Sequence, residues 1–475
     1  MRHHLICRTA ACLGLLIAGI VQSPALLAQP TDPGVRRAAT DNGPPRPLAG
    51  LGQDELSFFQ DGMARFSAIE VVSGGSSQEG TGNGLGPRFN SNQCASCHLQ
   101  PTVGGSSPAQ NPLGEVASAD GALNTLPWFI APNGPIREAR FVQSNGVTDG
   151  GVHDLFVITG RTDASAACNI AQPSFLPAGN PQTGQGGNKN IVFRIPTPTF
   201  GAGLIEAISD SAILANAAAN AAAKSQFGVR GHANAILGGN TNLSANDGTI
   251  TRFGWKAQNK SLLMFAGEAY NVEMGISNQL FPQERDETPG CHAGDATPED
   301  TDNMPTTVTA NAVGVLSDIE AFANFMRLLA PPAPAPATAS TLNGRAQFAA
   351  VGCALCHTPS FTTGSAMATG SSRIPSPALS NQPVNLFSDL LVHHMGQNLA
   401  DGITQGAAGP DEFRTAPLWG LGERVFFLHD GRTNDLLAAI QAHDSQGSEA
   451  NGVIQRFNAL SVGQQQDVLN FLRSL

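Results

Sequence analysis

The chain has 475 residues, of which 41% are hydrophobic and only 13% are charged, so it is apolar enough to bury a sizeable core. Its 53 glycines and 32 prolines predict long irregular connections. The formal net charge of -11 argues against nucleic acid or an anionic membrane as a partner, and is compatible with a partner protein that has a basic face.

Residues 1–28 have the pattern of a secretory signal peptide. Two arginines precede an apolar run over 10–21, and small residues then lead to Ala28, near which we expect cleavage. No later stretch is long and apolar enough to span a bilayer. We therefore expect an exported protein, periplasmic or secreted, without a membrane span.

Two cysteine-containing pentapeptides predict the cofactor. Cys94-Ala95-Ser96-Cys97-His98 and Cys353-Ala354-Leu355-Cys356-His357 share one pattern, of which about 0.003 copies are expected by chance at this composition. Two thiols at this spacing reach the vinyl groups of a haem as thioethers, and the adjacent histidine binds the iron. The sequence therefore predicts two covalently bound c-type haems, with His98 and His357 as iron ligands.

Two other cysteines, Cys168 and Cys291, remain after the predicted cleavage. In an oxidising compartment such thiols often pair. A disulfide between them and two separate buried thiols are equally good interpretations.

Internal repetition extends beyond the haem motifs. Three further markers occur in the same order in both halves: a phenylalanine five residues before the first haem cysteine, a Phe-Arg pair followed by proline and glycine, and an Asn-Phe-x-Arg run. The first-half copies are Phe89, 193–203 and 324–329, and the second-half copies are Phe348, 413–422 and 470–475. The chain is therefore interpreted as two copies of one unit.

The two units are expected to differ in length. The interval from His98 to the first Asn-Phe pair is about twice the corresponding interval after His357. We expect an N-terminal haem domain over 29–330, enlarged by loop insertions with a helical stretch near 205–224, an Ala/Pro-rich linker over 331–340, and a C-terminal haem domain over 341–475.

Each unit is expected to end in an amphipathic helix, the first beginning at the capping signal Ser317-Asp318. The apolar residues at helical spacing are Ile319, Phe322, Phe325, Met326 and Leu329 in the first helix, and Val468, Leu469, Phe471 and Leu472 in the second. The expected fold is mainly α, with two cytochrome c-like haem domains in tandem and the first enlarged by long loop insertions.

His443 is the preferred second axial ligand of the second haem. It closes the helical-looking segment 434–443, and a second nitrogen ligand would give a low-spin iron suited to carrying electrons. The rival ligands are Met395, His393, His394 and His429.

Several motifs resemble known families. The two-haem plan, the stretch 413–417 and the turn 429–432 resemble bacterial dihaem cytochrome c peroxidases and their relative that matures a tryptophan-derived quinone cofactor. A closer resemblance, over nearly the whole chain after residue 28, is to the dihaem oxidoreductase family, described as peroxidases or thiol oxidoreductases. Its motifs here are 84–98, 252–257, 274–276, 388–391 and 395–396. In that family the histidine in the His443 position is expected to be an iron ligand, whereas the peroxidases have methionine there.

The resemblance implies catalytic roles for three residues around the first haem. Trp255 falls at the position of a tryptophan between the haems, and Glu268 and Glu273 fall near a glutamine and at a glutamate on the peroxide-binding face. A carboxyl in a confined pocket suits proton transfer during O–O cleavage. The alternative interpretations are core packing for Trp255 and solvated carboxylates for the two glutamates.

The chain departs from the peroxidases in one respect. Their resting first haem is blocked by a histidine about sixteen residues after the proximal ligand, and the segment 112–114 here contains none. We therefore expect a first haem that is either open and high-spin or capped by a more distant residue. The candidate caps are His153, His232, His292 and Met274. The related families also hold Ca2+ between the haems, largely through backbone oxygens.

The resemblance implies a periplasmic dihaem peroxidase. Electrons would enter from a small cytochrome or cupredoxin at the C-terminal haem, and a small oxidant such as hydrogen peroxide would bind at the N-terminal haem. Two alternatives stay open: an oxygenase of the dihaem rubber-cleaving type, and an electron carrier in which both irons are six-coordinate.

Overall fold

The computed structural model describes residues 1, 29–36, 45–70, 84–86, 88–119, 126–157, 172–175, 190–235, 250–283, 300–301, 316–365 and 375–475. All but the first residue of the expected signal peptide lie outside the described residues. So do Cys168, Cys291 and His292, so the expected disulfide and one candidate iron ligand belong to segments for which no structure is given.

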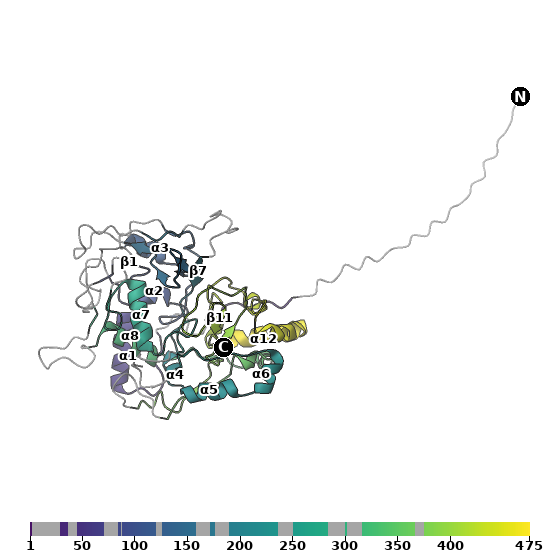
Figure 1. Ribbon diagram of the computed structural model, residues 1–475. Helices are drawn as coiled ribbons and strands as arrows, with labels where there is room; N and C mark the ends of the chain where they lie inside the picture. Colours follow the sequence, from purple (N-terminus) through teal and green to yellow (C-terminus); the bar gives the residue numbers. More distant parts are fainter. Residues whose placement is uncertain are drawn as a thin grey trace.

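Helices are the longest elements of the described chain, in agreement with the mainly α fold expected (Figure 1). They are α1 (Gln53–Phe66), α2 (Cys94–Cys97), α3 (Leu113–Ala119), α4 (Ala202–Glu206), α5 (Asp210–Ala218), α6 (Ala221–Phe227), α7 (Leu262–Met274), α8 (Asp318–Leu328), α9 (Ala339–Val351), α10 (Leu436–Gln441), α11 (Asn451–Asn458) and α12 (Val462–Ser474), with 3-10 turns η2 (Cys353–Leu355) and η4 (Leu421–Glu423). The helical stretch expected near 205–224 is divided among α4, α5 and α6.

Short strands pair antiparallel into small sheets among the described residues. The strands are β1 (Arg88–Phe89), β2 (Glu138–Phe141), β3 (Gln143–Ser144), β4 (Val147–Thr148), β5 (Val152–His153), β6 (Phe156–Val157), β7 (Ile191–Arg194), β8 (Phe361–Thr362), β9 (Pro383–Val384), β10 (Val392–His394) and β11 (Glu412–Arg414). The sheet in the order β5-β2-β7 and the pair β10-β11 position polar residues that are important below.

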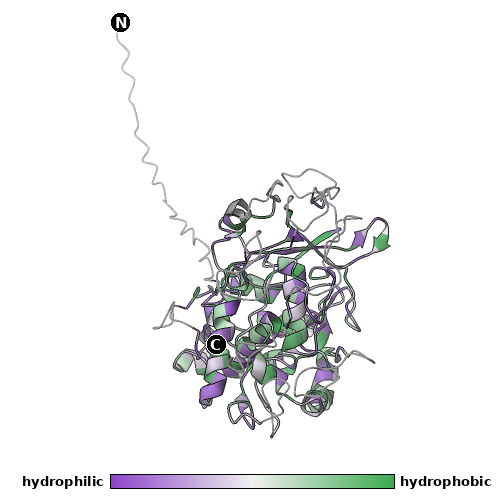
Figure 2. Cartoon of the chain, turned by 90° about the vertical axis from the view of Figure 1, so that its left-hand side faces the viewer, coloured by the Kyte–Doolittle hydropathy of each residue, from purple (hydrophilic) through white to green (hydrophobic). Residues whose placement is uncertain are grey.

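The helix α8 begins where the sequence predicts. Ser317 is its N-cap residue, and the carboxylate of Asp300 accepts hydrogen bonds from the backbone N–H groups of Asp318 (2.7 Å) and Ile319 (3.1 Å). These bonds satisfy two amides that would otherwise lack partners at the helix start. The apolar stripe of α8 then packs in the core beside α1 and α7. Figure 2 shows hydrophobic residues along the helices in the middle of the molecule.

The helices α1 and α8 cross closely beside the first haem motif. A Cβ atom at Gly62 would lie 2.3 Å from the carbonyl oxygen of Ala321, so the crossing requires glycine. One turn later, the ring of Phe66 lies 5.0 Å from that of Phe325 and edge-on to the imidazole of His98 at 5.9 Å. The crossing therefore brings an aromatic wall to the first haem histidine.

The helices α9 and α12 cross in the same way beside the second motif. A Cβ atom at Gly344 would lie 1.9 Å from the carbonyl oxygen of Asp467. One turn later, the ring of Phe348 lies 5.5 Å from that of Phe471 and 6.2 Å from the imidazole of His357. Figure 1 shows α1, α7 and α8 on one side of the molecule and α12 with β11 on the other.

One pairing in the repeat differs from the sequence-based alignment. The structural counterpart of Phe348 is Phe66, which follows a crossing glycine by four residues, and not Phe89. Phe89 lies in β1 opposite Phe156 of β6. The alignment failed because α9 leads directly into its haem motif, whereas a long segment separates α1 from Cys94.

Replacing Gly344 with alanine is expected to destabilise the protein by about 1–3 kcal/mol, because the added methyl group forces α9 away from α12. The matched control is Gly463→Ala in α12, where a Cβ atom meets nothing within 4 Å. This control should be neutral or stabilising by up to about 1 kcal/mol. Urea unfolding of the two haem-loaded variants would check the difference, and equal midpoints would contradict it.

No helix in the described ranges combines the length and apolar character that crossing a membrane requires.

Candidate functional site

A cavity adjoins the first haem motif. It has about 1170 Å³ of empty volume, including space open to solvent, and Cys94, Cys97 and His98 lie in its wall. The same wall contains all three residues that the resemblance singles out, Trp255, Glu268 and Glu273. The structure thus brings together the residues that the sequence assigns to the first site.

A second cavity, of about 1360 Å³ by the same measure, adjoins the other motif. Cys353, Cys356 and His357 line it, together with His443, which follows the end of α10 by two residues. The helix α10 begins at its N-cap Asp435, whose carboxylate accepts a hydrogen bond from the N–H of Ala438 at 2.6 Å. The capped helix fixes where the His443 side chain enters the cavity.

The three histidines assigned to iron share one hydrogen-bonding pattern. The Nδ1 atoms of His98, His357 and His443 lie 3.0, 3.0 and 2.8 Å from the backbone oxygens of Gly105, Phe387 and Ala439, respectively. An Nδ1–H that donates to a carbonyl leaves the Nε2 lone pair free for a metal. Burial also lowers the pKa of His98 and of His357 to about 4, so both imidazoles are neutral at pH 7, as iron ligation requires.

The cysteines of neither motif form a disulfide. Burial raises the pKa of Cys97 and of Cys353 to about 12, so neither forms a thiolate at neutral pH. Such thiols fit a structural role as thioether anchors better than a role as nucleophiles.

Two arginines, the buried Arg424 and the half-buried Arg414, complete the fit of the second cavity to a haem. Arg414 and Arg424 line it, and burial lowers the pKa of each to about 10. The Nε atom of Arg424 is buried and has no hydrogen-bond partner among the described residues. A haem propionate supplies the negative charge and acceptor atoms that these guanidinium groups require.

The rival ligands of the second haem fall into two groups. His393 lies 3.0 Å from a carboxylate oxygen of Asp389 and 2.8 Å from one of Glu449. Burial alone would lower its pKa, but the charge and hydrogen bond of Asp389 act to raise it, and both ring nitrogens are already engaged by carboxylates. His394 lies at the surface, whereas His393, Met395 and His429 line the cavity together with His443.

The residues proposed as a second axial ligand of the first haem lie in different places, and most of those described lie away from the first cavity. His153 lies 2.7 Å from Asp149 and stacks on Phe141, outside the first cavity. His232 lies at the surface, and His292 is outside the described residues. Among the candidates in the described ranges, Met274 alone lines the first cavity.

Glu273 belongs to a hydrogen-bonded group that includes residues from β2 and the segment before α2. Its Oε2 accepts a hydrogen bond from the Asn90 amide at 2.8 Å, and its side chain shares a hydrogen bond with Glu138. Burial, followed by the charge of Glu138, raises the pKa of Glu273 to about 8. Glu273 therefore carries a proton at neutral pH.

Glu138 is the charged member of this carboxyl pair. Burial raises the pKa of Glu138, but the charge and hydrogen bond of Arg140 outweigh this effect, so the pKa is lowered overall. Nε of Arg140 lies 2.5 Å from Oε1 of Glu138. Arg140 also donates to the carbonyl oxygen of Gly150 at 2.9 Å, which fixes its position. Glu268, on the same helix as Glu273, accepts a hydrogen bond from Asn259 and faces the same cavity.

Trp255 lies between the two cavities and lines both. It sits in a tight turn in which Gly254 has φ +83°, a conformation that favours glycine. Its indole N–H donates to the carbonyl oxygen of Ile195 at 2.8 Å, and its ring meets that of His429 edge-on at 6.4 Å. An aromatic ring fixed in this way provides a bridge between the two sites.

Sequence reasoning missed Glu138 and Arg140, which no motif marks, and Asn90, which lies inside the 84–98 motif. It also missed the two arginines of the second cavity, although Arg414 belongs to the repeated Phe-Arg pair. That repeat was a usable signal for at least one of them.

Comparisons with known proteins agree with two haem sites. Residues 187–475, more than half of the chain, match the family model described as "Di-haem oxidoreductase, putative peroxidase". The second haem motif lies inside the matched residues and the first lies before them. No curated protein matches the chain in sequence.

Three solved structures are similar over part of the chain. Hydrazine synthase from Kuenenia stuttgartiensis is 19% identical with a TM-score of 0.22, covering 35% of this chain and 56% of that one. A MauG-like protein associated with microbial copper homeostasis is 15% identical with a TM-score of 0.23, covering 35% of this chain and 55% of that one. The diheme peroxidase BthA from Burkholderia thailandensis is also 15% identical, with a TM-score of 0.27, covering 47% of this chain and 65% of that one. The chain thus spans less than two thirds of the length of each.

Proposed function

The chain belongs to the di-haem oxidoreductase family, and from that premise we propose that it is an exported peroxidase that reduces hydrogen peroxide at its first haem site. The observation that best supports the proposal is the composition of the first cavity. One wall contains a haem motif, a glutamate that holds a proton at neutral pH, and a tryptophan shared with the second cavity.

When bound, the two haems supply the two electrons that, with two protons, convert hydrogen peroxide to two waters. The chain's own residues handle the protons. Glu273, which holds a proton at neutral pH, gives it to the outer peroxide oxygen as the O–O bond breaks and takes in exchange the proton of the oxygen nearer the iron, so its own protonation state is restored. Glu138 and Asn90 hold the carboxyl group in place, and Glu268 is a second carboxylate in the same cavity.

We propose that electrons enter at the second site and pass by way of Trp255. His357 and His443 would both bind the second iron, which closes that site to oxidants. The donor would be a small cytochrome or cupredoxin whose basic face complements the acidic chain. The Ca2+ ion that the resemblance implies stays a prediction, which metal analysis of the purified protein would check.

We also propose that the chain is a tandem of two haem domains, 29–330 and 341–475, joined by the linker 331–340. The matching helix crossings, α1 on α8 and α9 on α12, support this division. The proposed export signal over 1–28 would direct the protein to a compartment in which c-type haem is attached.

The purified protein should contain two covalently bound haems per chain and show one high-spin and one low-spin ferric signal. A haemochrome assay and electron paramagnetic resonance measure these quantities. Peroxide should then be consumed in the presence of a small electron donor, each peroxide taking two electrons. Two low-spin signals without turnover would instead indicate an electron carrier, and oxygen uptake with an unsaturated hydrocarbon would indicate an oxygenase.

A further inference from the structure

One tyrosine lines the first cavity and has no part in the mechanism proposed above. Tyr270, on α7, is the single tyrosine of the chain, and it belongs to the same cavity wall as the first haem motif. The residue is only 1% exposed, and the ring of Phe322 on α8 packs edge-on against its ring at 5.1 Å. A phenol is, with the indole of tryptophan, the side chain that most readily gives up one electron to an oxidised haem.

The phenol oxygen meets carboxyl groups. Its O–H donates to Oδ2 of Asp318 at 3.1 Å, and it also shares a hydrogen bond with Glu70. Oδ1 of Asp318 accepts a hydrogen bond from the guanidinium of Arg65 at 2.9 Å, and Asp318 is itself the first residue of α8. The guanidinium and the helix together fix the Asp318 side chain, so an acceptor for the phenolic proton is held in place.

Glu70 gives this group a second place for a proton. It is 4% exposed, and its Oε2 atom is buried without a hydrogen-bond partner among the described residues. Burial, followed by the charge of Asp318, raises the pKa of Glu70 to about 7. Glu70 therefore exchanges a proton near neutral pH, so a proton that leaves Tyr270 need not stay on Asp318.

Trp255, the other aromatic residue of this wall that is readily oxidised, has a different partner. Its indole N–H donates to the carbonyl oxygen of Ile195, which takes up no proton at neutral pH. An electron can leave Trp255 and be replaced without proton transfer, as a relay requires. An oxidised phenol is a strong acid, and it loses its proton to a base within hydrogen-bond reach. Tyr270 has such a base and suits the role of an electron source.

We propose that Tyr270 is a redox-active residue that gives one electron to the first haem site after peroxide has oxidised it, while its phenolic proton passes to Asp318. The inference rests on the proposed peroxidase function, which supplies the oxidant. One hydrogen peroxide takes up two electrons and two protons as it becomes two waters. When no donor protein is bound, Tyr270 supplies one of these electrons and haem iron supplies the other. The phenolic O–H bond breaks, a new O–H bond forms on Asp318, and a neutral tyrosyl radical remains.

Electron paramagnetic resonance of the haem-loaded protein, frozen soon after hydrogen peroxide is added without a donor, tests the proposal. A free-radical signal is expected in the wild type and should be absent from Tyr270→Phe. Because the chain has one tyrosine, protein made with ring-deuterated tyrosine should give a narrower signal, which assigns the radical to this ring. Asp318→Asn keeps the phenol but lacks the base, and it should form the radical about 10²–10⁴-fold more slowly.

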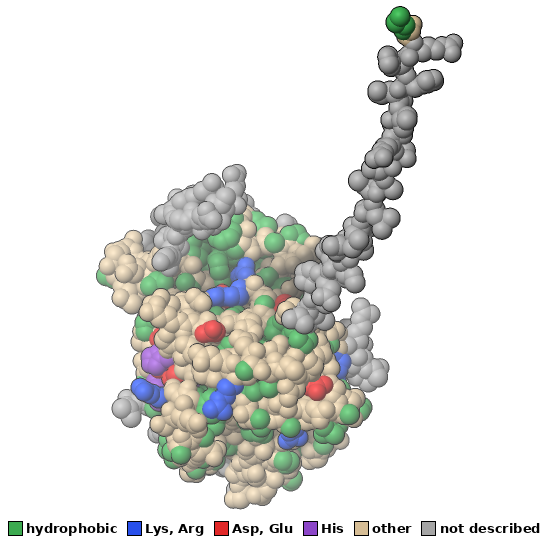
Figure 3. Space-filling model, turned by 90° about the vertical axis from the view of Figure 1, so that its right-hand side faces the viewer, with side chains coloured by type: hydrophobic (Ala, Val, Ile, Leu, Met, Phe, Trp, Pro, Cys, Tyr) green, Lys and Arg blue, Asp and Glu red, His purple; other side chains and the backbone are tan. Residues whose placement is uncertain are grey.

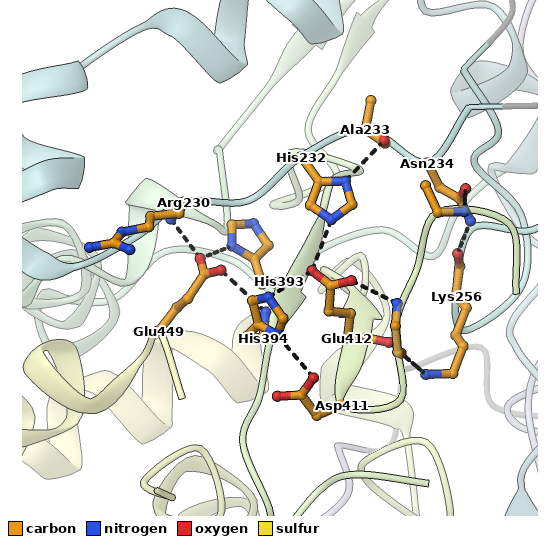
Figure 4. Close-up of polar contacts among 12 residues, drawn as sticks. Arg230, His232, Ala233, Asn234, Lys256, His393, His394, Asp411, Glu412 and Glu449 are labelled. Carbon is orange, nitrogen blue, oxygen red and sulfur yellow. Dashed lines mark hydrogen bonds and ion pairs between the residues drawn. The ribbon is translucent and has the colours of Figure 1, made fainter. Parts of the chain in front are cut away.

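The matched control is Glu412→Gln. Glu412 is as buried as Glu70, but it lines neither haem cavity. Its partners are imidazoles: Figure 3 shows histidine side chains beside acidic ones at the surface of the molecule, and Figure 4 shows His232 and His394 close to Glu412. Loss of this carboxylate should leave the radical signal and the haem absorption spectrum as they are in the wild type.

A photogenerated one-electron oxidant, ruthenium(III) tris-bipyridine, separates this proposal from the peroxidase proposal because it needs no peroxide. The tyrosyl signal should form with this oxidant as well. A tyrosyl signal with ruthenium but none with peroxide would contradict the peroxidase proposal and support the assignment of Tyr270 as an oxidisable residue. No radical with either oxidant, or a radical that ring deuteration leaves unchanged, would overturn the proposal. Both of these results come from the wild type, so they do not depend on whether Tyr270→Phe folds.

Discussion

Replacing Glu273 with glutamine is expected to lower peroxide turnover by about 10²–10⁴-fold while both haems remain in place. Glutamine keeps the shape of the side chain but has no proton to give or take. The amide can still bond to Asn90, so the wall of the cavity should keep its form. The measurement is steady-state peroxide consumption with a small electron donor, together with the absorption spectrum of the resting enzyme.

The pH dependence of this variant provides a second readout. The pKa of Glu273 is raised to about 8 in the folded protein, whereas an unfolded chain has the usual glutamate value. The native state therefore holds a proton between about pH 5 and 8 that the unfolded chain has lost, and stability falls as the pH rises through this window. Glu273→Gln removes one such group, so its stability should fall less steeply over the same range.

Other buried carboxyl groups also make stability fall as the pH rises, and they account for the part of the slope that remains in the variant. Burial, followed by the charge of Asp318, raises the pKa of Glu70 and of Asp300 to about 7. The slope should consequently be reduced in Glu273→Gln but not abolished. The control Glu115→Gln, at an exposed position on α3, should change neither turnover nor slope. Full turnover in Glu273→Gln would refute the proton-transfer role.

The sequence predicts the parts of this protein that rest on covalent or periodic patterns. The haem motifs, the Ser317 cap and the final helix could all be located because each has a fixed spacing. The crossing of α1 on α8 could not be predicted, because Gly62 and Phe66 are separated from Cys94 by a long segment and no local sequence pattern marks them.

Residues that act through long-range contacts were the hardest to predict. Glu138 and Arg140 reach Glu273 only because β2 lies beside the first cavity, more than a hundred residues away along the chain. A single sequence carries no information about such pairs, whose proximity is produced by the fold.

Replacing His443 with glycine is expected to remove the low-spin component of the resting spectrum and leave the first haem signal unchanged. The Nδ1–H bond to Ala439 presents Nε2 to the second cavity, so the substitution removes one axial ligand of that site alone. Electron paramagnetic resonance of wild type and variant would measure the change. Reduction by the electron donor should slow as well, since the second haem would lose its low-spin state.

Rescue by free imidazole distinguishes a lost ligand from a lost structural contact. The cavity left by glycine should admit imidazole and restore the low-spin signal, whereas a merely structural histidine would not respond in this way. Met395 and His429 line the same cavity, so a partial low-spin signal of altered shape in His443→Gly would mean that one of them had taken its place. The surface variant His394→Ala should keep both signals. Two unchanged signals in His443→Gly would show that another side chain is the native ligand, and His429→Phe and Met395→Leu would then identify it.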